Sequence, residues 1–476
     1  MKPTRCSYWL AAILILLGHV CTSGTALAMQ TLKSEPRWID CPFEVSSRVK
    51  CGEIDALENR DHPNGKQVTL RFAVISAHRK QAEAAPIAYL TGGPGFSAFT
   101  MLKLLPELSI SKDQDVIVLE PRGYGYSEPA LLCPSKAELK SCHKRFVDNG
   151  IDVSQYTTEA SVEDYEELRR SLGVDRWNLL GVSYGTYWAS LYLRMYPDSI
   201  RSVIMDSPYP LNASYRWNRV AFLNAFDLMA DSCKADVSCN EVYPDLRARF
   251  ITAMRRLKNE PATFENETLD HVTTFGHLFE TIYLTNTLKL TPRIVDALAR
   301  EDYAEFLSLA GRPFMDLPRG IASDRLMATG LNASVMCQED IYQPASLETR
   351  VAASSPWPPD IVDMITPEGW DYDERCKAWS VPIMEGSITK PVVSDIPVLV
   401  SVGAFDPVTP QPFAEAMMLH LSNSKLALGR VASHGLLLDP DDECIQTIYA
   451  NFIANPDMHA DTSCLMAKWP VPWDVR

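Results

Sequence analysis

Short runs of apolar residues recur along the chain, and each is followed within two residues by glycine, proline or aspartate. Four of these runs lie at 87–90, 116–119, 177–180 and 203–205. Segments with helical spacing of apolar residues alternate with them, which predicts a mostly parallel sheet covered by helices. Residues 68–74 follow the turn sequence Pro63-Asn64-Gly65, and their side chains alternate between inward and outward positions as in a strand. We therefore expect an antiparallel hairpin at the start of the sheet.

The strand rhythm stops between about residues 211 and 392. Apolar residues three and four positions apart replace it, for example at 220–229, 246–257 and 294–309. Strand-like runs return at 396–400 and 426–428, and a helical segment follows each. The pattern predicts an α/β fold with a first core part at 29–210, a helical cap insertion at 211–392 and a C-terminal core part at 393–476.

The amino-terminal segment has the features of a secretory signal. Lys2 and Arg5 precede an apolar run at 9–17, and Ala26-Leu27-Ala28 provides small residues for cleavage. The alternative is a retained membrane anchor, but nine strongly apolar residues are far fewer than the ~20 that a spanning helix needs. We expect residues 1–28 to be removed. The mature protein should be exported to the periplasm or medium, without stable membrane association.

Composition and cysteine usage exclude further classes of protein. The chain has 45 Lys and Arg against 60 Asp and Glu, a formal charge of −15, which argues against nucleic-acid binding. Of its twelve cysteines, ten lie after the signal segment, an even number that suits an oxidising compartment. Proximity suggests five disulfides: 41 with 51, 133 with 142, 233 with 239, 337 with 376, and 444 with 464. Because the sequence has neither a C-x-x-C nor an H-E-x-x-H motif, we expect no metal, and we expect no other cofactor.

The strongest chemical motif is Gly181-Val182-Ser183-Tyr184-Gly185. It follows the apolar run at 177–180 and opens a helical segment, which is the context of a nucleophile elbow. Such a tight turn presents the serine oxygen above the sheet, and the helix amino terminus favours negative charge. We expect Ser183 to be a nucleophile; the alternative is a serine in an ordinary surface turn.

A serine nucleophile needs a base and an acid that orients the base, and both should follow it in the chain. Three histidines lie in the final block: His420, His434 and His459. His420 falls in a helical run and His459 in a polar tail, whereas His434 lies in a loop after a strand. Asp406 ends the strand before it and is the predicted acid. Asp206 is the second choice, although we expect it to cap the turn before Pro208.

Acyl transfer also requires donors for the oxyanion. Thr91-Gly92-Gly93-Pro94-Gly95 follows the strand at 87–90, where this architecture places a backbone donor. We expect the N–H groups of Gly93 and Tyr184 to form the oxyanion hole, with Gly92 as the alternative to Gly93. A plain glycine turn is the competing interpretation.

Taken in order, these motifs carry a family resemblance. G-G-P-G, E-P-R-G-Y-G-Y-S, G-V-S-Y-G, the helical block, G-A-F-D-P-V-T-P and S-H-G resemble the α/β-hydrolase serine peptidases that include proline iminopeptidase and tripeptidyl aminopeptidase. The usual histidine before G-G-P-G is Thr91 here, and the usual aspartate of the next motif is Glu120. The resemblance implies the α/β-hydrolase fold and a triad of Ser183, Asp406 and His434.

The resemblance also implies an activity. In this family a serine attacks a peptide carbonyl near a free amino terminus, and acidic residues of the cap bind the α-ammonium group. Glu339 and Asp340 are the candidates here; otherwise they are two solvated acids on a loop. We therefore expect an exported aminopeptidase of prolyl or tripeptidyl type that acts on peptides. A carboxylesterase or lipase of the same fold is the main alternative, and a non-catalytic binding module is the third.

Overall fold

The computed structural model describes residues 35–79, 84–134, 138–215, 218–310, 317–343, 356–365, 372–384, 386, 388–458 and 460–475. All of the elements below belong to the unit Ser34–Arg476. The predicted signal segment at 1–28 and His459 lie outside the described residues.

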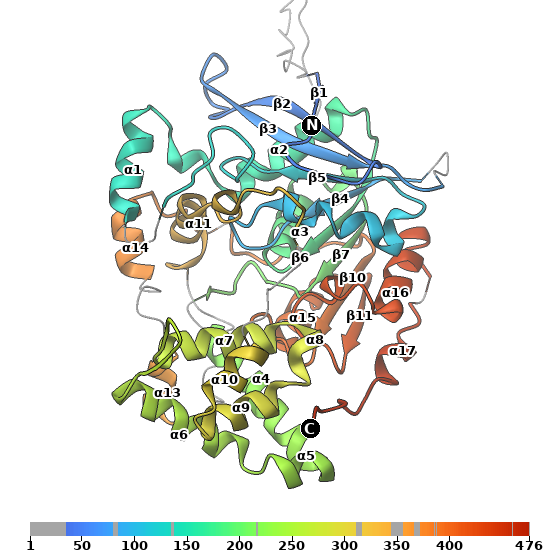
Figure 1. Cartoon of the computed structure of the whole chain (residues 1–476). Helices are drawn as coiled ribbons and strands as arrows, with labels where there is room; N and C mark the ends of the chain where they lie inside the picture. The colour runs from blue at the N-terminus through green and yellow to red at the C-terminus, as the bar shows by residue number, and fades with distance from the viewer. Residues whose placement is uncertain are drawn as a thin grey trace, which may run out of the picture. The chain divides into compact units, whose positions relative to one another are not determined.

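A nine-stranded sheet organises the fold (Figure 1), with the strand order β1-β2-β3-β5-β4-β6-β7-β10-β11. Its strands are β1 (Arg37–Ile39), β2 (Val49–Leu57), β3 (Gln67–Ile75), β4 (Ile87–Leu90), β5 (Val116–Glu120), β6 (Trp177–Val182), β7 (Ile200–Asp206), β10 (Val398–Gly403) and β11 (Ser424–Gly429). The pairs β1–β2, β2–β3 and β3–β5 are antiparallel, and all other pairs are parallel. The predicted mostly parallel sheet and its initial hairpin are confirmed.

Burial on both faces explains why the central strands appear as unbroken apolar runs. In β6, Leu179 and Leu180 belong to two different hydrophobic clusters, because successive side chains point to opposite faces. The helices of the core are α1 (Leu139–Asp148), α2 (Thr158–Ser171), α3 (Tyr184–Met195), α15 (Gln411–Met418), α16 (Glu443–Ala454) and α17 (Ser463–Met466). Three short 3-10 helices lie within 98–111, and the last of them (Ser109–Ser111) packs against α16.

The helical block between β7 and β10 divides into two packing groups (Figure 1). The first group has its own hydrophobic cluster and contains α4 (Asn218–Ala235), α5 (Val237–Val242), α6 (Leu246–Asn259), α7 (His271–Tyr283), α8 (Thr285–Leu288), α9 (Thr291–Ala299), α10 (Tyr303–Ala310) and α13 (Pro359–Met364). A small hairpin of β8 (Ala262–Phe264) and β9 (Glu267–Leu269) lies between α6 and α7. The second group contains α11 (Thr329–Val335), a π-helical turn (Met336–Asp340) and α14 (Tyr372–Trp379). Leu331 and Trp379 of this group share the hydrophobic cluster of the central sheet, so the block is not one uniform cap.

The helical stretch expected at 294–309 is broken into α9 and α10. Glu301, between them, has a left-handed backbone with φ of 62°. The Asp302 carboxylate then accepts a hydrogen bond from the Glu305 N–H at 3.0 Å. This local bond caps the amino terminus of α10 and restarts the helix, which hydrophobic spacing alone does not reveal.

All five predicted disulfides are present: 41 with 51, 133 with 142, 233 with 239, 337 with 376, and 444 with 464. Four of them join residues close in sequence, and Cys337–Cys376 ties the π-helical turn to α14. Within the described part of the chain, none of the helices combines the length and apolar character that crossing a bilayer requires.

Candidate active site

Ser183 occupies the sharp turn between β6 and α3. Its φ of 58° lies in the left-handed region, which a non-glycine residue adopts only when its surroundings enforce it. The Ser183 N–H donates to the Asp206 carbonyl at 2.8 Å and so ties the turn to β7. Gly185 is required because a Cβ there would overlap the Leu90 carbonyl oxygen. The elbow is thus held by strands on both sides, with the Ser183 side chain nearly buried.

His434 and Asp406 lie together. Nδ1 of His434 is 2.9 Å and 2.8 Å from the two carboxylate oxygens of Asp406, and both residues are buried. The carboxylate also accepts hydrogen bonds from the N–H groups of Val408 and Thr409, each at 2.8 Å. With Nδ1 donating to the carboxylate, Nε2 is the ring atom left for proton transfer.

The loop that carries His434 is held by two consecutive residues at the end of β7. The Ser207 hydroxyl accepts a hydrogen bond from the Gly435 N–H at 2.7 Å. The Asp206 carboxylate accepts from the N–H groups of Leu436 and Leu437 at 2.9 and 2.8 Å. Asp206 therefore anchors the histidine loop rather than capping the turn before Pro208. The expectation that Asp206 caps the turn before Pro208 was wrong, because its hydrogen-bond partners lie more than 200 residues away in the sequence and no local pattern points to them.

The helices of the first packing group contact the same loop. The His434 N–H donates to the Tyr283 carbonyl at 3.1 Å, and the Ser433 N–H donates to the Thr285 hydroxyl at 2.9 Å. The ring of Tyr283 lies 4.5 Å from the imidazole, centroid to centroid. Among the described residues, Nε2 of His434 has no hydrogen-bond partner. The imidazole is thus shielded by α7 and α8, and its Nε2 makes no hydrogen bond to another residue in the described part of the chain.

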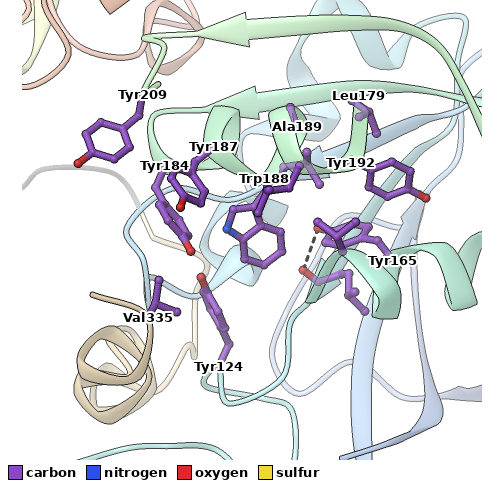
Figure 2. Packing of buried hydrophobic residues seen from close by; sticks show 14 of the residues in the cluster. Tyr124, Tyr165, Leu179, Tyr184, Tyr187, Trp188, Ala189, Tyr192, Tyr209 and Val335 are labelled. Carbon is purple, nitrogen blue, oxygen red and sulfur yellow. Dashed lines mark hydrogen bonds between the residues drawn. The ribbon is translucent and has the colours of Figure 1, made fainter. Parts of the chain in front are cut away.

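The glycine-rich loop after β4 lies over the elbow. A Cβ on Gly92 would come within 3.4 Å of the Ser183 Cβ and 3.9 Å of its Oγ, so the missing side chain leaves room beside the nucleophile. Tyr184 is the first residue of α3, and its N–H therefore lacks an intrahelical acceptor. Its side chain points away into an aromatic cluster with Tyr187 and Trp188 (Figure 2).

Glu120, the residue that replaces the usual aspartate, supports the segment that follows this loop. Its buried carboxylate accepts hydrogen bonds from the Ser97 hydroxyl at 2.7 Å, the Phe99 N–H at 3.3 Å and the Tyr126 N–H at 3.2 Å. Burial raises its pKa to about 7, although these donors favour the ionised form. These three hydrogen bonds hold the longer glutamate side chain in one position.

Glu339 and Asp340 are neither solvated nor on a loop: both are buried in the π-helical turn. Glu339 accepts a hydrogen bond from the Thr158 N–H at 2.6 Å and another from the Thr158 hydroxyl, which also bonds the Tyr184 hydroxyl. Burial raises the Glu339 pKa to about 8. Glu339 thus sits at the amino terminus of α2 and connects that helix to the elbow helix α3.

Asp340 faces a different set of groups. Its Oδ2 accepts from the Tyr209 hydroxyl at 2.5 Å, and its Oδ1 accepts from the Ser214 hydroxyl at 3.0 Å and the Tyr215 N–H at 2.9 Å. The Tyr215 hydroxyl reaches the Gly93 carbonyl at 3.0 Å. One tyrosine therefore connects Asp340 to the glycine loop beside Ser183.

The sequence reasoning missed the anchoring role of Asp206 and Ser207 and the position of Tyr215. Asp206 was visible as an acid at a strand end, but its partners are backbone N–H groups that no motif marks. Tyr215 follows β7 without any distinctive spacing. The described residues contain no cluster of three or more His, Cys, Asp or Glu side chains arranged to bind a metal ion.

Comparison with known proteins agrees with this architecture. Residues 85–264 match the family model described as alpha/beta hydrolase fold, and residues 366–464 match the model described as TAP-like protein. “Putative hydrolase YuaR” of Escherichia coli strain K12 is 23% identical over 98% of this chain and 97% of its own length. “Tripeptidyl aminopeptidase” of Streptomyces coelicolor is 28% identical over 36% of this chain. “Serine protease Hip1” of Mycobacterium tuberculosis is 25% identical over 48%.

The two peptidase alignments span 37% and 51% of the lengths of those relatives. Together the two models cover the strands β4 to β7, β10 and β11, the elbow and the histidine loop. Residues 85–264 are therefore an α/β-hydrolase domain and residues 366–464 a TAP-like region, and the motifs of the chain resemble those of proline iminopeptidase and tripeptidyl aminopeptidase.

Proposed function

We propose that the protein is an exported serine aminopeptidase that uses Ser183, His434 and Asp406 as a catalytic triad. The observation that carries this proposal is the bond between His434 Nδ1 and the Asp406 carboxylate, in a loop anchored at the end of β7 beside the elbow. Three segments far apart in the chain meet there. The five disulfides support an oxidising compartment, in keeping with export.

In the acylation step, Ser183 Oγ attacks the carbonyl carbon of the scissile bond while its proton passes to Nε2 of His434. The Asp406 carboxylate stabilises the imidazolium. The oxyanion is placed against the N–H groups of Gly93 and Tyr184. When the carbon–nitrogen bond breaks, His434 returns its proton to the leaving amine, and the acyl group remains on Ser183.

Deacylation repeats the sequence with water. His434 removes a proton from the attacking water molecule, and the second tetrahedral intermediate collapses to release the carboxylic acid and the Ser183 hydroxyl. In apo structures the hydrogen bond from nucleophile to base is often loose and tightens only in the substrate complex. The unoccupied Nε2 of His434 is compatible with that behaviour.

The acidic pair is the proposed anchor for the substrate α-ammonium group. Of the two residues, Asp340 is better placed, because Tyr215 connects it directly to the loop beside Ser183, whereas Glu339 supports α2. A carboxylate forms a stronger, charge-assisted hydrogen bond with an ammonium ion than with a neutral donor. Anchoring the terminus fixes the distance to the scissile bond, as an exopeptidase requires.

The test compares peptide amides that have a free amino terminus with the same peptides acetylated at that end. The proposal predicts a kcat/KM at least about 100-fold higher for the free amines, since an ammonium paired with a buried carboxylate contributes roughly 3 kcal/mol. Equal rates would favour the carboxylesterase alternative. Asp340→Asn should reduce the preference, while Asp61→Asn, on an exposed turn, should not.

A further inference from the structure

Tyr215 places a phenol hydroxyl between the glycine loop and the nucleophile. The hydroxyl donates to the Gly93 carbonyl at 3.0 Å, and the nearby Ser183 hydroxyl partly offsets the rise in the phenol pKa that burial causes. None of the steps of the triad mechanism uses this group. It nevertheless lies near Ser183 and bonds the loop that provides a predicted oxyanion donor.

Hydrogen bonds and ring packing fix the position of Tyr215. The Asp340 carboxylate holds the Tyr215 N–H at 2.9 Å and the neighbouring Ser214 hydroxyl at 3.0 Å. The Tyr209 ring packs against that of Tyr215 with centroids 4.9 Å apart, and the Tyr209 hydroxyl bonds the other oxygen of Asp340. A donor fixed in this way needs little rearrangement when charge develops near it, which is the condition for effective electrostatic catalysis.

The position of the hydroxyl matters because the substrate carbonyl must enter the same space. Its carbon has to reach Ser183 Oγ, and its oxygen has to turn toward the glycine loop and the start of α3. In the resting state the phenol proton is donated to the Gly93 carbonyl. Nε2 of His434 has no hydrogen-bond partner among the described residues.

We propose that the Tyr215 hydroxyl is a catalytic group that donates a third hydrogen bond to the oxyanion, beside the N–H groups of Gly93 and Tyr184. This inference rests on the proposed serine mechanism. As Ser183 attacks, its proton moves to His434. The phenol proton then turns from the neutral Gly93 carbonyl to the negatively charged oxygen, which is the stronger acceptor.

No proton leaves Tyr215 in this step. Burial raises the pKa of the phenol above its ordinary value, so the group remains a donor at neutral and mildly alkaline pH. When the intermediate collapses, the substrate carbonyl re-forms and the phenol proton returns to Gly93. The same exchange serves acylation and deacylation, because both pass through an oxyanion at the same place.

The test is Tyr215→Phe, with Tyr196→Phe at the carboxyl end of α3 as the matched control. We expect kcat to fall about 10- to 100-fold for both a peptide amide and p-nitrophenyl acetate, with KM within about twofold of the wild type. The rate of phosphonylation by a fluorophosphonate should fall by a similar factor. A peptide aldehyde, which forms an oxyanion on Ser183, should bind Tyr215→Phe more weakly by the same factor, whereas product inhibition should not change.

An unchanged or higher kcat in Tyr215→Phe would overturn the inference, because the hydroxyl would then only block the empty site. A loss confined to KM would also overturn it. The inhibition constants of the aldehyde and of the product separate a catalytic effect from a folding defect. A folding defect in Tyr215→Phe weakens the binding of both inhibitors equally, whereas the loss of an oxyanion donor weakens only that of the aldehyde. If Ser183→Ala retains activity, the proposed function itself fails; if Ser183→Ala is inactive and Tyr215→Phe is normal, only this inference fails.

Discussion

Nδ1 of His434 lies 2.8 Å from a carboxylate oxygen of Asp406, although 28 residues separate the two along the chain. Asp406 is itself oriented by the N–H groups of Val408 and Thr409 and by the Thr409 hydroxyl. Three donors besides the imidazole therefore point the carboxylate at the ring. In the proposed mechanism the pair provides a base whose tautomer is set before substrate arrives.

Replacing Asp406 by asparagine should leave the fold intact and reduce kcat by about 10³- to 10⁴-fold. Asparagine is nearly the same size, but its amide no longer stabilises the imidazolium and can hold the ring in the wrong tautomer. The measurement is kcat on a peptide amide, together with the thermal midpoint. A loss of less than about tenfold would show that another acid serves His434.

Asp206→Ala should behave in the opposite way and mainly cost stability. It leaves the buried N–H groups of Leu436 and Leu437 without their acceptor, and each such group costs about 1–3 kcal/mol. We expect the free energy of unfolding to fall by about 2–5 kcal/mol in denaturant titrations. Asp61→Ala, at an exposed position, is the control. If the folded Asp206→Ala protein loses as much kcat as Asp406→Asn, Asp206 has a direct part in catalysis.

The protein should be less stable at pH 9 than at pH 5.5. Burial raises the pKa of Glu339 to about 8, of Glu120 to about 7 and of Asp206 to about 6. The folded state thus holds protons that the unfolded chain releases near pH 4. This contribution to stability is complete below about pH 4 and is lost as the pH rises through 6 to 8.

Glu339→Gln tests the largest of these shifts, because glutamine does not titrate. The difference in thermal midpoint between pH 5.5 and pH 9 should be smaller in the variant than in the wild type. Each unit by which folding raises the pKa contributes at most about 1.4 kcal/mol to the free energy of unfolding. An unchanged pH dependence would mean that Glu339 is ionised in the folded protein throughout this range.

Two glycines should respond to alanine in opposite directions. At Gly185 a Cβ would overlap the Leu90 carbonyl oxygen, so Gly185→Ala should destabilise the protein by more than about 3 kcal/mol and displace the elbow. At Gly276, inside α7, nothing lies within 4 Å of the added Cβ. Gly276→Ala should stabilise by about 0.5–1 kcal/mol, because alanine favours a helix. Chemical denaturation of both variants measures the contrast.

The sequence predicted the parts of the molecule that local pattern controls. The run at 87–90 is β4 in full, the run at 177–180 begins β6, and Ser183 falls on the turn that its flanking glycines require. The disulfides followed from proximity. His434 was selected from chain order and from its place in a loop after a strand, and its ring lies 2.8 Å from the Asp406 carboxylate.

Features that depend on distant contacts were not predictable in this way. The helical block from 211 to 392 has one kind of hydrophobic spacing, yet Leu331 and Trp379 pack with the central sheet rather than with α4–α10. The left-handed backbone at Glu301 interrupts the helical periodicity, and the capping bond at Asp302 starts α10. Asp206 and Tyr215 act on partners from other segments, and their roles became visible only when those partners were located.

The most direct test of the account is to treat the mature protein with a fluorophosphonate and map the modified residue by mass spectrometry. The account predicts one adduct per chain, on Ser183, with hydrolytic activity lost in proportion to labelling. Ser183→Ala should show neither adduct nor activity while retaining the thermal midpoint of the wild type. Modification of a different residue, or full activity in the Ser183→Ala protein, would contradict it.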